Sequence, residues 1–274
     1  MKTFFVVILS AFALLWPISS GAAPDAELWE FWTKHDPKSS RSVDHSGWQK
    51  FLDTYVVASS DGINRVAYQK ASQAGQALLE GYITDLTELK PRALNRNEQQ
   101  SYWINLYNAL TVNVILDHYP VESILEIKTS PGFFSPGPWG QKLVTIEGQK
   151  ISLDDIEHKI LRPIWQDNRI HYAVNCASIG CPNLNKVAYT AANTDKLLNE
   201  NAIAYINHPR AVRVDNGALV VSSVFEWYKI DFGNNDRGVI THLKKHAAPK
   251  LKSALSTVST IDDDAYDWVL NEVQ

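Results

Sequence analysis

The sequence has little cysteine, little methionine and no excess of positive charge. Two cysteines in 274 residues, Cys176 and Cys181, exclude a disulfide-dense scaffold and a four-cysteine zinc module. The formal net charge of −4 gives no basic stripe of the kind that favours nucleic acid, so we expect no nucleic-acid partner. One methionine stands against nine tryptophans and eleven tyrosines. This aromatic content predicts a substantial core or a binding cleft.

Long apolar runs are also scarce, and the clearest one lies at the N-terminus. Phe4–Leu15 is too short to span a bilayer, follows Lys2, and precedes the small residues Ser20 and Ala22. This order is typical of a secretory signal over residues 1–22, with an uncleaved anchor as the alternative. We therefore expect an exported protein, periplasmic or extracellular, without stable membrane insertion. In an oxidising compartment the redox state of the two cysteines becomes the central question.

The remaining chain predicts an N-terminal helical segment over residues 23–47 and one α+β domain over 48–274. Helices and hairpins fall in separate groups, which favours packed helices around a mainly antiparallel sheet. Apolar periodicity predicts helices at Asp25–Lys34, Gly47–Val57, Tyr68–Thr87, Glu98–His118, Ser152–Arg162, Thr194–Ile206 and Gly238–His246. Hairpins are expected to turn at Glu147–Gly148 and Asn216–Gly217, a short strand at Ile170–Val174, and an irregular loop at Ser130–Gly140.

The predicted helix Glu98–His118 is apolar almost all round but carries one polar seam. Ser101, Asn105, Asn108 and Thr111 follow one another at spacings of four, three and three. Buried amides need hydrogen-bond partners. We favour the interpretation that these side chains hold loops in place, and the alternative is a wall of a polar site.

Glu157 lies on the inward apolar stripe of the predicted helix Ser152–Arg162. A carboxylate that points inward needs a cation or hydrogen-bond donors. His158 falls on the flank shared by Asp154 and Arg162, at spacings of four, where an exposed charge ladder is expected. Glu157 is therefore the more unusual of the two neighbours.

His171, Cys176 and Cys181 follow in the next segment. In a strand, His171 and Cys176 would point to opposite faces. A helical turn starting at Pro182 would place Cys181 at its N-terminus, where the pKa of a thiol is lowered. Which thiol meets an imidazole stays open at this point.

Five segments in chain order resemble the DUF547 family, over about Trp48–Asn271: SYWINLYNALTVNVILDHYP, ISLDDIEHKILRP, RIHYAVNCASIGCPNL, VFEWYKIDF and YDWVLN. The resemblance implies a single α+β domain, often exported in bacteria. It also implies that several polar residues occupy motif positions: Glu157, His158, Arg162, His171, Asn175, Cys176 and the Cys181–Pro182 pair.

One hypothesis is a thiol-dependent hydrolase or acyltransferase without a cofactor, acting on a small-molecule or peptide ligand. Cys176 or Cys181 would be the nucleophile, an imidazole would manage the proton, and Glu157 would orient His171. His158 is included among the catalytic candidates. The substrate-binding candidates are Asn105, Asn108, Asn175 and Arg162, with the amides as donors to an oxyanion.

The alternative is a non-enzymatic envelope binding or interaction domain in which Cys176 and Cys181 form a disulfide. The loop Pro131–Trp139 and the pair Trp227–Tyr228 would then line a groove, although ordinary core packing is the more common role of such aromatics. A third reading, metal binding through His171 and both cysteines, lacks a clear fourth ligand, and we expect no metal. Solvated positions are expected for the pair His242 and His246 and for the run Asp262–Asp264.

Overall fold

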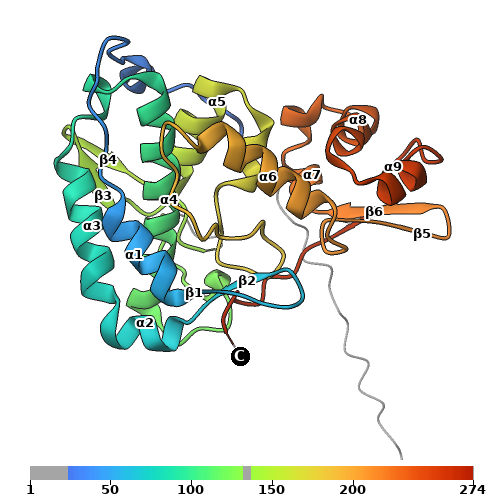
Figure 1. The fold of residues 1–274 in the computed structure, drawn as a ribbon, viewed down its shortest axis with the longest axis horizontal. Helices are drawn as coiled ribbons and strands as arrows, with labels where there is room; N and C mark the ends of the chain where they lie inside the picture. The colour runs from blue at the N-terminus through green and yellow to red at the C-terminus, as the bar shows by residue number, and fades with distance from the viewer. Residues whose placement is uncertain (1–23, 132–136, 274) are drawn as a thin grey trace, which may run out of the picture.

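The computed structural model describes residues 24–131 and 137–273 (Figure 1). The expected signal segment, residues 1–22, lies outside this part of the chain, as does the middle of the expected loop at 130–140. Helices dominate the described chain and the sheets are small, so the predicted α+β single-domain class is confirmed.

Helix α4 (Arg96–His118) runs through the larger group of helices, beside α3, and is buried along most of its length. Asn95 starts it by accepting a hydrogen bond from the backbone N–H of Glu98 at 3.1 Å. The elements that precede α4 are η1 (Glu30–Thr33), α1 (Ser46–Tyr55), β1 (Val56–Ala58), β2 (Asn64–Val66), α2 (Tyr68–Ala74), α3 (Gln76–Glu88) and η2 (Pro91–Ala93). Helices α2 and α3 pack against α4, and α1 packs on α3.

Two N-terminal predictions are wrong. Asp25–Lys34 contains only the 3₁₀ turn η1, because the N–H groups of Glu27 and Trp29 bond to the carbonyls of His158 and Lys159 instead of to a helix of their own. The single helix expected at Tyr68–Thr87 is divided between α2 and α3.

The break between α2 and α3 falls at Gly75. A Cβ on this residue would lie 2.5 Å from the ring of Tyr55, so glycine allows α1 to approach closely here.

The segment after α4 carries the candidate residues. Its elements are η3 (Ile124–Glu126), β3 (Val144–Ile146), β4 (Gln149–Ile151), the π-helix η4 (Asp155–Leu161), α5 (Arg162–Trp165), the 3₁₀ helix η5 (Asn168–Tyr172) and α6 (Thr194–Ile206). The predicted strand Ile170–Val174 is therefore wrong. The Asp167 carboxylate accepts the backbone N–H of Arg169 at 2.9 Å and starts a helical turn there.

The C-terminal part consists of β5 (Val212–Asp215), β6 (Ala218–Ser222), α7 (Val224–Trp227), η6 (Lys229–Phe232), α8 (Asp236–His246), α9 (Pro249–Leu255) and β7 (Asp263–Ala265). The predicted hairpin at Asn216–Gly217 is confirmed, and both of its turn residues have positive φ. Asp263 and Asp264, expected in a turn, instead belong to β7, which pairs in parallel with β6. Their side chains are exposed.

His242 and His246 correct another prediction. Both are buried on the inner side of α8, and the Tyr172 hydroxyl lies 2.8 Å from His242 Nε2. Lys245 is exposed on the outer side of the same helix, so the solvated face belongs to the lysine and not to the histidines.

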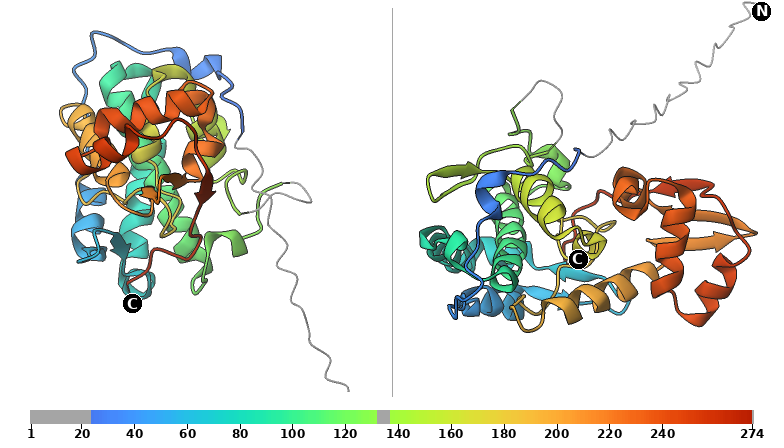
Figure 2. Two further views of the ribbon diagram at one scale, coloured as in Figure 1. Left: turned by 90° about the vertical axis from the view of Figure 1, so that its right-hand side faces the viewer. Right: turned by 90° about the horizontal axis from the view of Figure 1, so that it is seen from above.

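The apolar core forms two clusters. One surrounds α4, and the other lies among α6, β5, β6, α8 and α9. The right-hand view of Figure 2 shows the helices around α4 on one side of the molecule and β5, β6, α8 and α9 on the other. The π-helix η4 packs on α4 in the first cluster, whereas η6 packs on α8 beside the second. The candidate site lies where these two parts of the molecule meet.

Candidate active site

His171 connects the two parts of the molecule. Its Nε2 lies 2.7 Å from Asp231 Oδ2 in η6, and its Nδ1 faces Glu157 Oε1 in η4 at 3.6 Å. The ring stacks on Tyr228 with 4.0 Å between ring centroids and is only 3% exposed. The Glu157 distance exceeds a good hydrogen bond, so we describe that contact as an ion pair.

The charges in this network stabilise one another. Burial alone would lower the pKa of His171, but hydrogen bonding to Asp231 and the charge of Glu157 outweigh it and raise the pKa. Burial would likewise raise the pKa of each carboxylate, yet the neighbouring cations lower both to about 2. Around neutral pH we therefore expect ionised carboxylates on both sides of an imidazole that favours its charged form.

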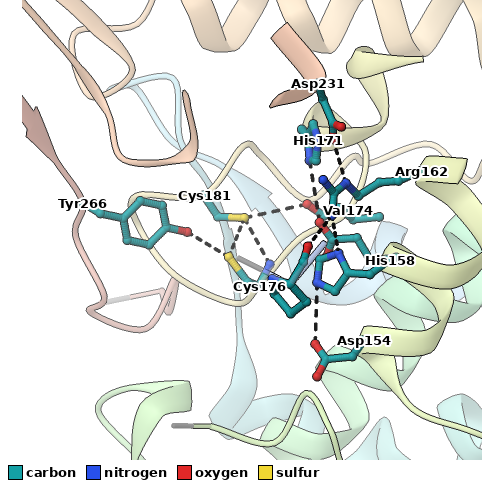
Figure 3. A network of polar contacts seen from close by, with 11 residues as sticks. Asp154, His158, Arg162, His171, Val174, Cys176, Cys181, Asp231 and Tyr266 are labelled. Carbon is teal, nitrogen blue, oxygen red and sulfur yellow. Dashed lines mark hydrogen bonds and ion pairs between the residues drawn. The ribbon is translucent and has the colours of Figure 1, made fainter. Parts of the chain in front are cut away.

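Arg162 and His158 extend the network (Figure 3). The Arg162 Nε donates to Asp231 Oδ2 at 2.7 Å, and its Nη1 donates to His158 Nδ1 at 3.0 Å. His158 Nε2 lies 3.7 Å from Asp154 Oδ1. Burial lowers the pKa of His158 and raises that of Asp154 to about 6, so a neutral imidazole is expected at pH 7.

The predicted exposed charge ladder of Asp154, His158 and Arg162 is only partly right. The three side chains do contact one another, but His158 and Arg162 are each only 5% exposed. The backbone N–H of Arg162 bonds to the carbonyl of Glu157, five residues earlier, which is π-helical geometry. The wider turn brings Glu157 and His158 inward together, whereas a regular α-helix would separate their faces.

The two thiols lie on the loop after η5. Cys176 Sγ and Cys181 Sγ are 2.9 Å apart, longer than the ~2.05 Å of a disulfide, and both cysteines are free. Tyr266 Oη lies 2.8 Å from Cys176 Sγ and also 2.8 Å from Ser178 Oγ. Figure 3 shows the tyrosine pointing at the thiol pair from the opposite side to His158.

The two thiols differ strongly in acidity. Hydrogen bonding to Cys181 lowers the pKa of Cys176 against the effect of burial, and the hydroxyl groups of Tyr266 and Ser178 add to this. Burial raises the pKa of Cys181 well above its usual value. Cys176 is also the more exposed of the two, while Cys181 is 4% exposed. The reactive thiol is therefore expected to be Cys176.

The prediction of a helical turn at Pro182 with an acidic Cys181 thiol is wrong. The chain after Cys181 is an irregular loop, and the Asn175 side chain donates to the Pro182 carbonyl at 2.7 Å within it. No helix N-terminus is available to Cys181 in this described loop, and apolar burial decides its pKa.

The polar seam of α4 holds the loops around the site. The Asn108 amide donates to the Ala173 carbonyl and accepts the Asn175 N–H, both at 2.8 Å. Asn105 makes the same pair of bonds to the backbone of Tyr189, at 2.7 and 3.0 Å. The favoured interpretation of the seam, in which its amides hold loops, agrees with these bonds. Contact of either amide with a substrate stays a prediction.

A strained backbone position follows the reactive cysteine. Ala177 has a φ of +57° and is fully buried, and its N–H donates to Asn175 Oδ1 at 2.9 Å. A non-glycine residue in this region is held there by its surroundings at a cost of about 1–3 kcal/mol. Such strain is common beside reactive groups, where it directs a side chain.

The structure brings together Glu157, His158, Arg162 and His171, and separately the two thiols. Among the described residues, no hydrogen bond joins a thiol to an imidazole, and no three histidine, cysteine or acidic side chains are placed to hold a metal ion.

Two surface hollows, of about 470 and 380 Å³, lie elsewhere on the molecule. In residues 24–131 and 137–273, no helix is both long and apolar enough to cross a bilayer.

Sequence reasoning did not single out Asp231 or Tyr266. Asp231 lies in the segment VFEWYKIDF and Tyr266 in YDWVLN, both of which carried the family resemblance. Neither residue lies at a helical or strand spacing from the other candidate residues, so no periodicity pointed to them. The contacts His171–Asp231 and Cys176–Tyr266 join residues 60 and 90 positions apart.

The fold and site define an α+β domain with a buried charge network beside a pair of free thiols. Residues 91–206 match the model of a family described as "Protein of unknown function, DUF547". The match includes Glu157, His171 and both cysteines but ends before Asp231, and it is shorter than the resemblance over Trp48–Asn271. Neither a curated protein nor a solved structure matches the chain.

Proposed function

We propose that this protein is an exported thiol-dependent acyl-transfer enzyme, a hydrolase or an acyltransferase, with Cys176 as its nucleophile. The observation that carries the proposal is the difference between the two thiols. Cys176 is the more exposed and the more acidic, and hydrogen-bond donors lie against its sulfur. Cys181 is buried and stays protonated, with its sulfur 2.9 Å from Cys176 Sγ, where it can donate to Cys176 once that thiol has lost its proton.

The reaction begins with attack of the Cys176 sulfur on the carbonyl carbon of an ester or amide. A C–S bond forms, the C–O or C–N bond breaks, and the thiol proton passes through an imidazole to the leaving group. Water or another acceptor then attacks the thioester, the C–S bond breaks, and the proton of the acceptor returns to the thiolate. The hydroxyls of Tyr266 and Ser178 lie 2.8 and 3.6 Å from the reacting sulfur.

His158 is the better candidate for the proton-transfer group. Both nitrogens of His171 face carboxylates and its pKa is raised, so it favours the charged form and is a poor base. His158 is expected to be neutral at pH 7, and its Nε2 has only a long contact, 3.7 Å, to Asp154. His171 then acts as a positioning residue that binds Glu157 and Asp231.

The experiment measures alkylation of the native protein by iodoacetamide between pH 5 and 10, with the labelled site read by mass spectrometry. We expect label at Cys176 with an apparent pKa below that of a free thiol, and a higher apparent pKa in Tyr266→Phe. Cys181→Ser controls for label at the second cysteine. If Cys176 in the native protein is inert, or titrates like a free thiol, the proposal fails.

A second measurement tests acyl transfer itself. Incubation with p-nitrophenyl acetate should leave an acetyl group on Cys176 and release p-nitrophenol, and His158→Asn should slow this acylation. Cys176→Ser should abolish the thioester. If acetylation is found only on lysines, acyl transfer through Cys176 is excluded.

The alternative of a non-enzymatic binding domain keeps one specific observation in its favour. The two sulfur atoms lie close enough that oxidation would need little movement to bridge them. Thiol counting on protein purified without reductant separates the cases: two thiols favour the enzyme, and none favours the bridged domain.

A further inference from the structure

The two thiols lie close enough on one short loop to react with each other. Cys176 Sγ and Cys181 Sγ are 2.9 Å apart, so an approach of about 0.9 Å would bring them to the ~2.05 Å of a disulfide. The backbone N–H of Cys176 also donates to Cys181 Sγ at 3.1 Å, which holds the second sulfur against the first residue. A bond between the sulfurs therefore needs little movement of the chain.

The loop between the cysteines is held on both sides. The Asn175 side chain accepts the Ala177 N–H at 2.9 Å and donates to the Pro182 carbonyl at 2.7 Å, so it fixes the backbone beside each cysteine. In the middle of the loop, Tyr205 Oη donates to the Gly180 carbonyl at 2.6 Å. These bonds keep the two sulfur atoms next to each other.

The two thiols differ in exposure as well as in acidity. Cys176 is half-buried, and hydrogen bonding to Cys181 lowers its pKa. Cys181 is only 4% exposed. An oxidant in solution therefore meets Cys176 first and reacts with its thiolate. Because only part of Cys176 is exposed, a small hydroperoxide reaches the sulfur more readily than a disulfide of another protein does.

We propose that the two cysteines form a modification site for hydroperoxides, in which Cys176 is oxidised and Cys181 converts the product into a reversible disulfide. The inference rests on the proposed function, because the bridge withdraws the nucleophile of the acyl-transfer reaction. It adds to that function a route by which the nucleophile escapes irreversible oxidation.

The first step consumes the hydroperoxide. The Cys176 thiolate attacks its terminal oxygen, an S–O bond forms and the O–O bond breaks. The departing alkoxide takes up the proton that the thiol had released, so the products are an alcohol and a sulfenic acid on Cys176. Tyr266 Oη, 2.8 Å from Cys176 Sγ, is placed to donate a hydrogen bond to the departing oxygen.

The second step closes the bridge. The Cys181 sulfur attacks the sulfenic sulfur of Cys176, the S–S bond forms, the S–O bond breaks, and the hydroxide leaves with the Cys181 proton as water. Burial is the main cause of the raised pKa of Cys181, and negative charge on Cys176 raises it further. A neutral sulfenic acid removes that charge, so oxidation of Cys176 favours ionisation of Cys181. The two thiols supply both electrons, and an external dithiol restores them.

Hydrogen peroxide is the probe, added to the full chain after reduction and removal of the reductant. One equivalent should remove two hydrogen atoms from the protein and block iodoacetamide label at both cysteines, and peptide mapping should place the bridge within one chain. Dithiothreitol should restore both labels. In Cys181→Ser, excess peroxide should instead add two or three oxygen atoms to Cys176, which dithiothreitol does not remove. Cys176→Ser is the matched control, whose buried thiol should stay reduced.

Recovery of activity is read separately. After peroxide and then dithiothreitol, acylation by p-nitrophenyl acetate should return to most of its original rate in the wild type, and to less than about a tenth of it in Cys181→Ser. Cys181→Ala repeats the test with a side chain that brings no buried hydroxyl.

Three results would overturn the inference. Peroxide converts wild-type Cys176 to a sulfinic acid while Cys181 stays free, both thiols survive excess peroxide, or Cys176→Ser is oxidised at Cys181 as fast as the wild type. A disulfide that joins two chains would also contradict it. Because the mass measurement needs no turnover, these outcomes are independent of whether acyl transfer itself is found.

Discussion

The carboxylate of Asp231 holds two buried cations, and neutralising it is the most direct test of the charge network. Asp231 Oδ2 lies 2.7 Å from both His171 Nε2 and Arg162 Nε, whose side chains are 2% and 3% exposed. The variant Asp231→Asn preserves the size of the side chain and removes its charge. Two buried cations would then lose their common partner.

Two independent estimates give the size of the expected loss in the free energy of unfolding. Folding lowers the pKa of Asp231 from 3.8 to about 2, which corresponds to about 2 kcal/mol of stability at neutral pH. Removing one partner of a buried ion pair costs about 3–5 kcal/mol in general. We therefore expect Asp231→Asn to lower the free energy of unfolding by about 2–5 kcal/mol.

The loss should depend on pH. The pKa of His171 is raised by folding, so its charged form stabilises the fold fully below the unfolded value of 6.5, and this is lost as pH rises through the raised pKa. The lowered pKa of Asp231 means that its contribution is present above 3.8 and lost as pH falls towards about 2. Between pH 4 and 6.5 both contributions act, whereas above the raised pKa of His171 mainly the pairing with Arg162 remains.

Urea unfolding at pH 6 and pH 9 measures both effects. The difference between wild type and Asp231→Asn should be larger at pH 6. Asp264→Asn, which removes an exposed carboxylate, should stay within about 0.5 kcal/mol at either pH. A loss below 1 kcal/mol at pH 6, or one that grows towards pH 9, would refute the assignment of a charged His171 to this network.

Two further predictions concern packing and loop support. Gly75→Ala should destabilise the protein by about 1–3 kcal/mol, since its Cβ meets the Tyr55 ring, while Gly81→Ala, with open space, should stabilise it by roughly 0.5–1 kcal/mol. Equal urea midpoints for the two variants would contradict this. Asn108→Ala leaves a buried carbonyl and a buried N–H unpaired and should cost roughly 2–4 kcal/mol, against less than about 0.5 kcal/mol for Asn113→Ala, measured by thermal unfolding at one pH. A small loss of stability in Asn108→Ala would contradict the inference that this side chain supports the thiol loop.

The sequence predicts secondary structure correctly where a single apolar periodicity or a single turn determines it. Thr194–Ile206 is the helix predicted, and the turn Asn216–Gly217 sets the hairpin because both residues accept positive φ. The signal failed at Ile170–Val174, where alternation of residue type suggested a strand. A side-chain cap from Asp167 starts a 3₁₀ turn there, and this local bond outweighs the alternation.

The inward position of Glu157 followed from apolar spacing, and its burial at 4% exposure confirms it. The burial of His158 did not follow, because the spacing was interpreted with 3.6 residues per turn and the π-helix has more. The acidity of the thiols was also beyond sequence reasoning. It depends on the approach of Cys181 and Tyr266 to Cys176, and Tyr266 is 90 residues distant in the chain.

Helix α4 links these observations, because its buried amides place the loop on which the thiols stand. Asn108 binds the backbone on both sides of Val174, two residues before Cys176, and Asn175 in turn holds the strained Ala177. The charge network instead holds His171, in η5 just before this loop, through Glu157 in η4 and Asp231 in η6. The position of Cys176 relative to His158 is therefore set by two separate supports, one from each side of the site. A substitution in α4 should change the reactivity of Cys176 while leaving the His171–Asp231 pair intact, and a substitution at Asp231 should mainly do the reverse.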